Sequence, residues 1–288
     1  MRIMTHRQDG SWICPGVRLR SCALLIAFCL LTVVRGNAGA WNQQRGHGEL
    51  ILTASWYRSE KQFDADGISW AMPDYRQFIT EASLEVGVSR RDSILLHVPG
   101  EFLVNQNGHQ EGTSLGDVEV SWKHSLLPLK SRWALSGQVL LKEPPYSETQ
   151  SPAPGNHQAD VEGRVLLGRG HELGRQHFFW DLEAAYRYRD GAPADQFRGD
   201  GTVGLEMHHG RYMLLGQVFN IVSMQNGQAL ATISNPNAQS DFDLYKVQPS
   251  FVVRVFERTH LQAAWNDAYA GRNTGQGQTW SFSIWQRF

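Results

Sequence analysis

Two histidine-containing pairs have residue types that acid–base catalysis uses. His97 and Glu101 lie four residues apart, and His208 and His209 are adjacent. In an extended strand four residues span about 13 Å, which is too far for His97 and Glu101 to contact each other. Adjacent strand residues point to opposite faces, so the side chains of His208 and His209 diverge. The sequence therefore predicts no catalytic site, and we expect the protein not to be an enzyme.

A third stretch has the residue types of a metal site. Phe63-Asp64-Ala65-Asp66-Gly67 resembles a fragment of a calcium-binding loop, but the later acidic ligands of such a loop do not follow. Asp-Gly is also a common turn sequence. We interpret the stretch as a turn and expect no metal and no cofactor.

The charged residues alternate with apolar ones along most of the chain, which indicates β-strands with one polar and one apolar face. The clearest case is 177–189, where Phe178, Trp180 and Leu182 alternate with Asp181 and Glu183. The segment 211–222 is apolar at both sets of positions, so its faces stay unassigned. Pro249 removes a backbone donor and predicts a bulge. The predicted strands are 48–58, 75–88, 93–103, 116–126, 132–142, 159–168, 177–189, 200–208, 211–222, 244–256, 259–269 and the terminal strand at 280–288.

The connections between these strands alternate in length. Short turns centre near Arg90, Pro128, Leu173, Gly210 and Arg258, and the intervening connections are mostly longer, as at 59–74, 143–158 and 223–243. Short turns on one side and long loops on the other are typical of outer-membrane barrels. The chain is therefore predicted to be all-β: a transmembrane antiparallel up-and-down β-barrel of about twelve strands, with ten or fourteen also open. We expect it in the outer membrane of a Gram-negative cell, with both termini periplasmic.

The polar faces would then line the lumen. They carry twelve acids and eight bases, and this mixture of signs argues against a dedicated anion channel. Either cross-strand pairing or a solute path accounts for such an interior. The predicted lumen-lining residues are Glu81, Glu85, His97, Glu101, Glu119, Lys123, Lys142, Glu162, Arg164, Asp181, Glu183, Arg187, Lys246 and Arg254.

The chain ends on an alternating aromatic strand. Trp280, Phe282, Ile284 and Phe288 share one face, which would aggregate in water unless it met lipid. A terminal Phe after alternating aromatics also resembles the signal that the outer-membrane assembly machinery recognises. Outer-membrane lipid and that machinery are the expected partners.

Residues 1–40 read as a cleaved secretory signal peptide, followed by a single barrel domain at 41–288. A basic start precedes the apolar run Cys22 to Val34, and Ala38-Gly39-Ala40 supplies the small residues of a cleavage site. All three cysteines lie in this segment. Its removal takes five of the 27 bases and one of the 28 acids, which leaves a net charge of about −5 and argues against a nucleic-acid partner.

Short motifs in the first third of the mature chain resemble a known family. Ala40-Trp41-Asn42-Gln43-Gln44, Gly46-His47-Gly48 and Phe63-Asp64-Ala65-Asp66-Gly67 resemble the opening of XagA-type outer-membrane proteins. The segments 81–96 and Leu115-Gly116-Asp117-Val118 resemble the wider barrel family of meta-pathway phenol degradation, although Lys123-His124 replaces its usual Lys-Tyr. The resemblance implies an outer-membrane barrel linked to transport or to surface polysaccharide, without catalytic residues.

Three functions follow as alternatives. The first is a narrow channel for passive or selective passage of small solutes, including hydrophobic or aromatic ones. The second is a non-conducting barrel that supports exopolysaccharide export or surface attachment, so that a small solute or a polysaccharide is the further partner. The third, a membrane-embedded hydrolase or acyltransferase, needs Ser and His on adjacent strands at one membrane interface.

Overall fold

The computed structural model describes residues 39–105, 111–128, 131–147, 154–155, 157–228 and 240–288, without the side chains of residues 101–105, 111 and 112. The predicted cleavage residue Ala38 and most of the predicted signal peptide lie outside the described residues. The barrel belongs to the compact unit Val33–Phe288. No helix within the described ranges has the length and apolarity that a membrane crossing needs.

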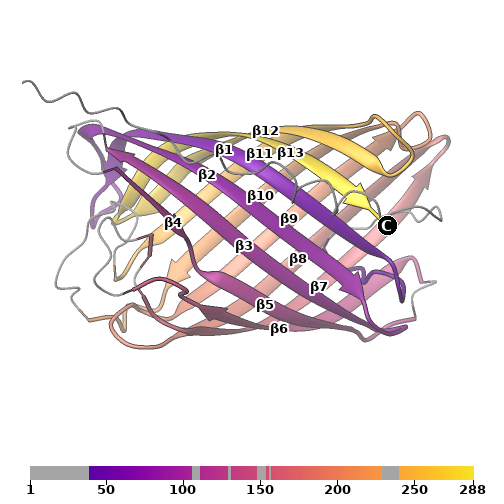
Figure 1. Cartoon of the computed structure of the whole chain (residues 1–288), viewed down its shortest axis with the longest axis horizontal. Coiled ribbons are helices and arrows are strands. Elements are labelled where there is room, and N and C mark those ends of the chain that lie inside the picture. The colour runs from indigo at the N-terminus through magenta and orange to yellow at the C-terminus, as the bar shows by residue number, and fades with distance from the viewer. Residues whose placement is uncertain (1–38, 106–110, 129–130, 148–153, 156, 229–239) are drawn as a thin grey trace, which may run out of the picture. The chain divides into compact units, whose positions relative to one another are not determined.

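Thirteen strand segments make up the barrel, because period-two alternation lets each segment place its apolar residues on one side (Figure 1). They are β1 (Gly48–Phe63), β2 (Ser69–Gly87), β3 (Asp92–Asn105), β4 (Glu111–Leu115), β5 (Val118–Ser125), β6 (Trp133–Glu143), β7 (Asp160–Leu173), β8 (Gln176–Arg189), β9 (Gln196–Met207), β10 (Tyr212–Ser223), β11 (Asp243–Arg254), β12 (Thr259–Arg272) and β13 (Thr274–Arg287).

The sheet closes on itself. Apart from β4 and β5, each strand pairs antiparallel with its neighbours in the chain, and β1 pairs with both β2 and β13. β4 and β5 pair with successive parts of β3 and are separated only by Gly116 and Asp117, so they act as one strand. The barrel therefore has twelve strands, and the predicted fold class and strand count are confirmed.

Short turns lie at one end of the barrel, hereafter the turn end, and include the two-residue connection 174–175 between β7 and β8. The opposite end, the loop end, carries the connections 144–159 and 224–242. The predicted long connection at 59–74 was wrong, because β1 and β2 extend through it and leave only 64–68. The last two strands are also longer than the predicted 259–269 and 280–288, since β12 and β13 extend until Asn273 alone joins them. Backbone pairing such as Phe63 with Ser69 continues the sheet past the apolar positions that the sequence pattern detects.

The Asp-Gly stretch forms the turn between β1 and β2. Oδ1 of Asp64 accepts hydrogen bonds from the amides of Asp66 at 2.9 Å and Ile68 at 2.8 Å. Gly67 has a positive φ of 76°, which a residue without Cβ adopts readily. The turn interpretation is therefore confirmed. The bulge predicted at Pro249 is wrong: the β11–β12 register shifts between Tyr245 and Lys246 and continues unshifted past Pro249, where the ladder merely lacks pairs.

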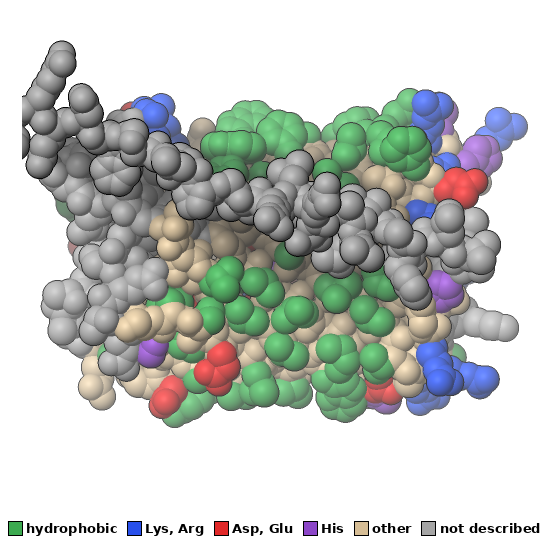
Figure 2. All heavy atoms as spheres, viewed as in Figure 1, with side chains coloured by type: hydrophobic (Ala, Val, Ile, Leu, Met, Phe, Trp, Pro, Cys, Tyr) green, Lys and Arg blue, Asp and Glu red, His purple; other side chains and the backbone are tan. Residues whose placement is uncertain are grey.

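Apolar side chains cover the outside of the barrel. Trp280, Phe282 and Ile284 of β13 are 57%, 54% and 49% exposed. Figure 2 shows hydrophobic side chains across the middle of one face and charged side chains mainly towards its two ends. The terminal Phe288 exchanges backbone hydrogen bonds with Gly48, so the end of β13 is fastened to the start of β1.

Candidate functional site

A network of buried ion pairs crosses the lumen around Glu162. Its side chain is 0% exposed, and its two oxygens accept hydrogen bonds from Nε of Arg164 at 2.8 Å and Nε of Arg187 at 2.7 Å. Arg164 also contacts Glu183 and, at 2.7 Å, Asp200. The carboxylates thus offset the burial of both guanidinium groups. Because Arg187 reaches Glu119 of β5 at 2.9 Å, the network ties non-adjacent walls together.

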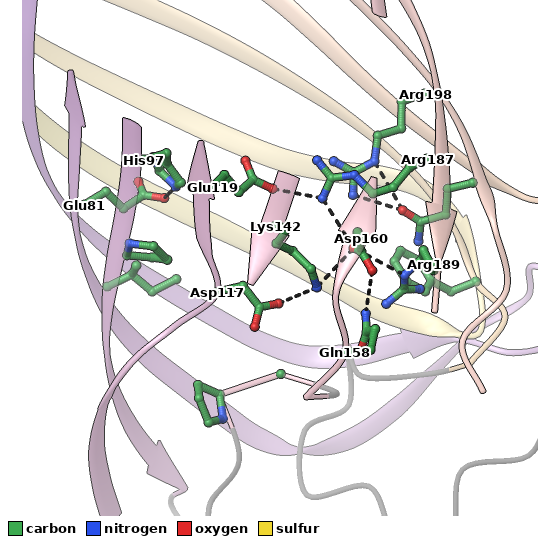
Figure 3. A pocket seen from close by; sticks show the side chains of 16 residues that line it. Glu81, His97, Asp117, Glu119, Lys142, Gln158, Asp160, Arg187, Arg189 and Arg198 are labelled. Atoms are coloured by element: carbon green, nitrogen blue, oxygen red, sulfur yellow. Dashed lines mark hydrogen bonds and ion pairs between the residues drawn. The ribbon is translucent and has the colours of Figure 1, made fainter. Parts of the chain in front are cut away.

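A second group of ion pairs lies nearer the loop end. Nζ of Lys142 is 2.6 Å from Asp117 and 3.0 Å from Asp160. The hydroxyl of Tyr146 donates to Asp117 at 2.8 Å, which joins the connection after β6 to the strand break between β4 and β5. Figure 3 shows Lys142 and Asp160 between an acidic side, with Glu81 and Glu119, and a basic side, with Arg187, Arg189 and Arg198.

The period of two explains why these residues meet. Asp160, Glu162 and Arg164 stand at alternate positions of β7, so all three point into the lumen. The register then sets Arg187 of β8 directly opposite Glu162. Cross-strand pairing, one of the two explanations of the charged interior, therefore occurs among Glu162, Arg164, Glu183 and Arg187. Asp181 differs: among the described residues it has no ion-pair partner.

A serine and a histidine also meet inside the barrel. Oγ of Ser83 on β2 is 2.8 Å from Nδ1 of His97 on β3, and Nε2 of His97 is 3.6 Å from Glu81. The sequence did not anticipate this contact, although Ser83 and His97 are cross-strand partners. Acyl transfer also needs donors aimed at the developing oxyanion. The backbone amides of β2 and β3 point along the wall because they serve the strand ladder, so we interpret the trio as a polar contact of the lumen.

Cavities follow one another along the lumen. The loop-end cavity has a volume of about 380 Å³ and shares His97, Glu119, Arg187 and Arg198 with a central cavity of about 350 Å³. The central cavity shares Ile51 with an apolar chamber of about 220 Å³. That chamber in turn shares lining residues with a turn-end cavity of about 530 Å³. The series extends from the loop end to the turn end.

The apolar chamber explains why 211–222 reads as apolar on both faces. Met213 and Leu215 of β10 point inward, and with Phe179, Val252 and Trp285 they form a buried cluster inside the barrel. Leu214 and Val218 point outward and are exposed. A lumen with an apolar region lets an inward-facing position be hydrophobic, so alternation alone does not orient this strand.

The residues before β1 enter the lumen as an extended plug, which we call the amino-terminal segment (residues 39–44). The carbonyl of Ala40, the predicted cleavage residue, accepts a hydrogen bond from Ser136 at 2.7 Å, and Ala40 is fully buried. The ring of Trp41 packs edge-on against Phe179 with centroids 6.3 Å apart. The amide of Gln43 donates to Ser93 at 3.1 Å. Sequence reasoning missed this placement because a segment outside any strand has no periodic pattern.

Most predicted lumen-lining residues border the interior cavities. Arg254 borders the turn-end cavity. Lys246 of β11 is half-buried and lies an even number of residues before the buried Val252, so the two are on the same face of the strand. The side chain of Glu101 is outside the described residues. Arg198 was missed because it lies outside the predicted strand 200–208. It is two positions before Asp200 and therefore on the same face of β9. The predicted residues that border the loop-end cavity or the central cavity are Glu81, Glu85, His97, Glu119, Lys123, Lys142, Glu162, Arg164, Glu183 and Arg187.

No group of three or more His, Cys, Asp or Glu side chains suited to a metal ion occurs among the residues with described positions. The arrangement as a whole offers fixed charges along a narrow interior, followed by an apolar chamber next to Trp41. Such a lining can select solutes by charge and by polarity.

No family model matches the sequence, and no curated protein matches it. Among solved structures, the chain resembles an outer membrane channel from Pseudomonas putida F1, with a TM-score of 0.65 and 10% identity over 88% of this chain and 100% of that one. It also resembles the NanC porin, with a TM-score of 0.51 and 10% identity over 82% of this chain and 98% of that one. At these identities the likeness concerns the fold. The chain is thus a closed, twelve-stranded antiparallel β-barrel of the outer-membrane type.

Proposed function

We propose that the protein is a narrow channel in the outer membrane that passes small solutes. The observation that carries this proposal is the series of cavities from the loop end to the turn end, each sharing lining residues with the next. A twelve-stranded barrel is wider than the side-chain-filled eight-stranded case and narrower than a sixteen-stranded porin. The likeness to a channel and a porin supports the same function.

The lining supports small solutes that tolerate both polar and apolar surroundings. A solute from the loop end first meets ion-paired carboxylates and guanidinium groups, and then a chamber lined by Trp41, Phe179 and Trp285. Hydrophobic or aromatic solutes suit such a chamber. The resemblance of the opening motifs to XagA-type proteins and to the barrel family of meta-pathway phenol degradation is part of this proposal.

The orientation is proposed from the connections. Short turns face the periplasm in outer-membrane barrels and long loops face outward. The turn end, where β1 begins and β13 ends, is then periplasmic. We also propose that residues 1–40 direct export and are removed before Trp41.

Planar-bilayer recording tests the function. Purified protein under a KCl gradient is expected to conduct weakly, with a small reversal potential of cation sign, because described inward-facing acids slightly outnumber bases even with Arg198 included. Replacing Glu81 and Glu85 together by Gln should move the reversal potential towards zero or past it, since Glu85 also balances Lys123 at 3.0 Å. Exchanging the exposed acids Glu60 and Glu143 for Gln removes as many charges without touching the cavities and should change little.

The non-conducting alternative has its own supporting observation. The network around Glu162 crosses the lumen, and the amino-terminal segment packs inside it against Ala134 and Leu166. A silent bilayer from well-folded protein would favour a barrel that supports polysaccharide export or surface attachment. Strong anion selectivity would contradict the assignment of inward charges.

A further inference from the structure

We propose that the lumen contains a binding site for a primary ammonium group, with Asp181 as its carboxylate, and that its ligand is the α-ammonium of Trp41. This inference rests on the proposed cleavage after Ala40. The docked terminus then forms the narrowest part of the path, between the central cavity and the apolar chamber.

The first observation is a buried carboxylate without a partner. Asp181 is 1% exposed, and its Oδ2 has no hydrogen-bond partner in the part of the chain that the structure describes. No described cation lies within ion-pair distance of it. A buried carboxylate without a cationic partner is strongly unfavourable, so a positive charge placed here would stabilise it.

The second observation is that the chain passes beside this carboxylate just before the cleavage point. A Cβ atom at Gly39 would lie 2.7 Å from Cγ of Asp181, so the backbone of Gly39 touches the carboxylate. Gly168, the cross-strand partner of Asp181, is in turn covered by the ring of Trp41. A Cβ there would lie 2.7 Å from that ring. Asp181 therefore lies within two residues of the bond to be cut.

Lys123 holds the segment but does not supply the missing charge. Lys123 is 1% exposed, and its ammonium donates to the carbonyls of Gly39 at 2.9 Å and Trp41 at 3.0 Å. It also pairs with Glu85 at 3.0 Å. The carbonyl of Trp41 remains after cleavage, so Lys123 still anchors the shortened segment.

Cleavage supplies a positive charge at this place. Hydrolysis of the Ala40–Trp41 peptide bond adds one water: the released piece keeps a carboxylate on Ala40, and Trp41 gains an α-ammonium. Gly39 and Ala40 then leave the space beside Asp181. Two residues span at most about 7 Å, so a small displacement of the freed terminus brings its ammonium to the carboxylate. A buried ion pair with an additional anchor replaces an unpaired charge.

The docked segment also determines the width of the path. Trp41 packs against Phe179 and lines the apolar chamber beside Ile51, the residue that the chamber shares with the central cavity, while Gly39 lines the central cavity. Release of the terminus would let this ring withdraw and join the two cavities. Docking and conduction are thus coupled, but they are measured separately.

Amine labelling of mature protein isolated from cells tests the site. The probe is 2-pyridinecarboxaldehyde, which modifies a free α-amine, followed by mass spectrometry of the amino-terminal peptide. An ammonium paired with a buried carboxylate has a raised pKa, and one pKa unit lowers the reactive neutral fraction about tenfold. Wild-type protein should therefore be labelled at least about tenfold more slowly than Asp181→Asn. Asp117→Asn, a lumen carboxylate paired with Lys142 at the loop end, is the control and should label like wild type.

A second variant keeps the test independent of how Asp181→Asn folds. One Gly inserted before Trp41 displaces the ammonium by about 3.5 Å while leaving Asp181 intact, and it should also be labelled fast. Equal rates in wild type, Asp181→Asn and the insertion variant would overturn the docking site, as would a mature chain that does not start at Trp41. If the barrel conducts but all variants are labelled at equal rates, the channel function holds and the docking site does not. If the wild-type terminus is protected from labelling but the barrel does not conduct, the docking site holds and the channel function does not.

Discussion

Replacing Glu162 by Gln should destabilise the barrel and shift its ion selectivity together. Glu162 is fully buried and accepts from Arg164 at 2.8 Å and Arg187 at 2.7 Å, with Arg198 at 3.9 Å. Removing one partner of a buried ion pair costs about 3–5 kcal/mol. Arg164 keeps Asp200 at 2.7 Å and Arg187 keeps Glu119 at 2.9 Å, so we expect the lower end, about 3 kcal/mol of unfolding free energy.

The same substitution leaves one uncompensated positive charge beside the central cavity. A permeating ion passing about 6 Å away in a water-like dielectric experiences about 0.7 kcal/mol, which changes its permeability about threefold. The cation preference should fall and the anion preference rise. High salt should reduce this shift, because the Debye length is only about 3 Å at 1 M.

Two measurements follow the two effects. Urea unfolding of the micelle-bound barrel, followed by tryptophan fluorescence in both directions, gives the stability change, and reversal potentials under a KCl gradient give the selectivity. Glu143→Gln is the matched control, because Glu143 is exposed at the end of β6 and should leave both quantities unchanged. An unchanged urea midpoint of unfolding in Glu162→Gln would refute the view that the network stabilises the barrel. A midpoint shift without any selectivity shift would mean that ions do not pass this network.

Three further predictions concern the ends of the chain and one connection. Amino-terminal sequencing of protein from outer membranes should start at Trp41, and a chain that retains Cys22 to Val34 would contradict the signal-peptide interpretation. Deleting Phe288 should sharply lower the assembled, heat-modifiable form in cells, although one such side chain contributes only about 1.5–3 kcal/mol to stability; normal assembly would exclude a recognition role. Burial alone would raise the pKa of Asp195 in the connection between β8 and β9, but hydrogen bonds from the Arg189 amide, Asn226 and Tyr186 outweigh it and lower the pKa. The stabilisation by this group is therefore present above the unfolded pKa of about 3.9 and is lost as the pH falls through the lower folded value. The hydrogen-exchange protection of the Met224 amide, which donates to the Asp195 carbonyl, should fall in that window in wild type and be low and pH-insensitive in Asp195→Asn.

The strands and most of the inner face were predictable because one physical rule governs both. In β8 a side chain meets either lipid or the lumen, so Trp180 and Leu182 on one side and Glu183 on the other follow directly from alternation. The rule fails where an inward position is also apolar, as at Met213 and Leu215. It says nothing about how far β12 and β13 pair beyond the apolar band, so the single-residue connection at Asn273 was missed.

The contacts within the lumen were harder to predict than its lining. Alternation places Ser83 and His97 inside, but only the strand register makes them cross-strand partners. The contact of Arg187 with Glu119 spans strands that are not adjacent, so it depends on the curvature of the closed wall. The burial of Trp41 depends on the amino-terminal segment turning inward, which no local pattern encodes.

The entry of residues 39–44 into the lumen limits how the protein can be handled. An affinity tag fused ahead of Trp41 would have to pass through a space that already holds the ring of Trp41 and the ammonium of Lys123. A tag after Phe288 would extend the seam where that residue exchanges backbone hydrogen bonds with Gly48. Both ends of the barrel domain are thus structural parts, and an epitope is better inserted in a connection at the loop end. The turn 64–68, with its exposed Asp66 and Gly67 beyond the lipid-facing band, is the natural place.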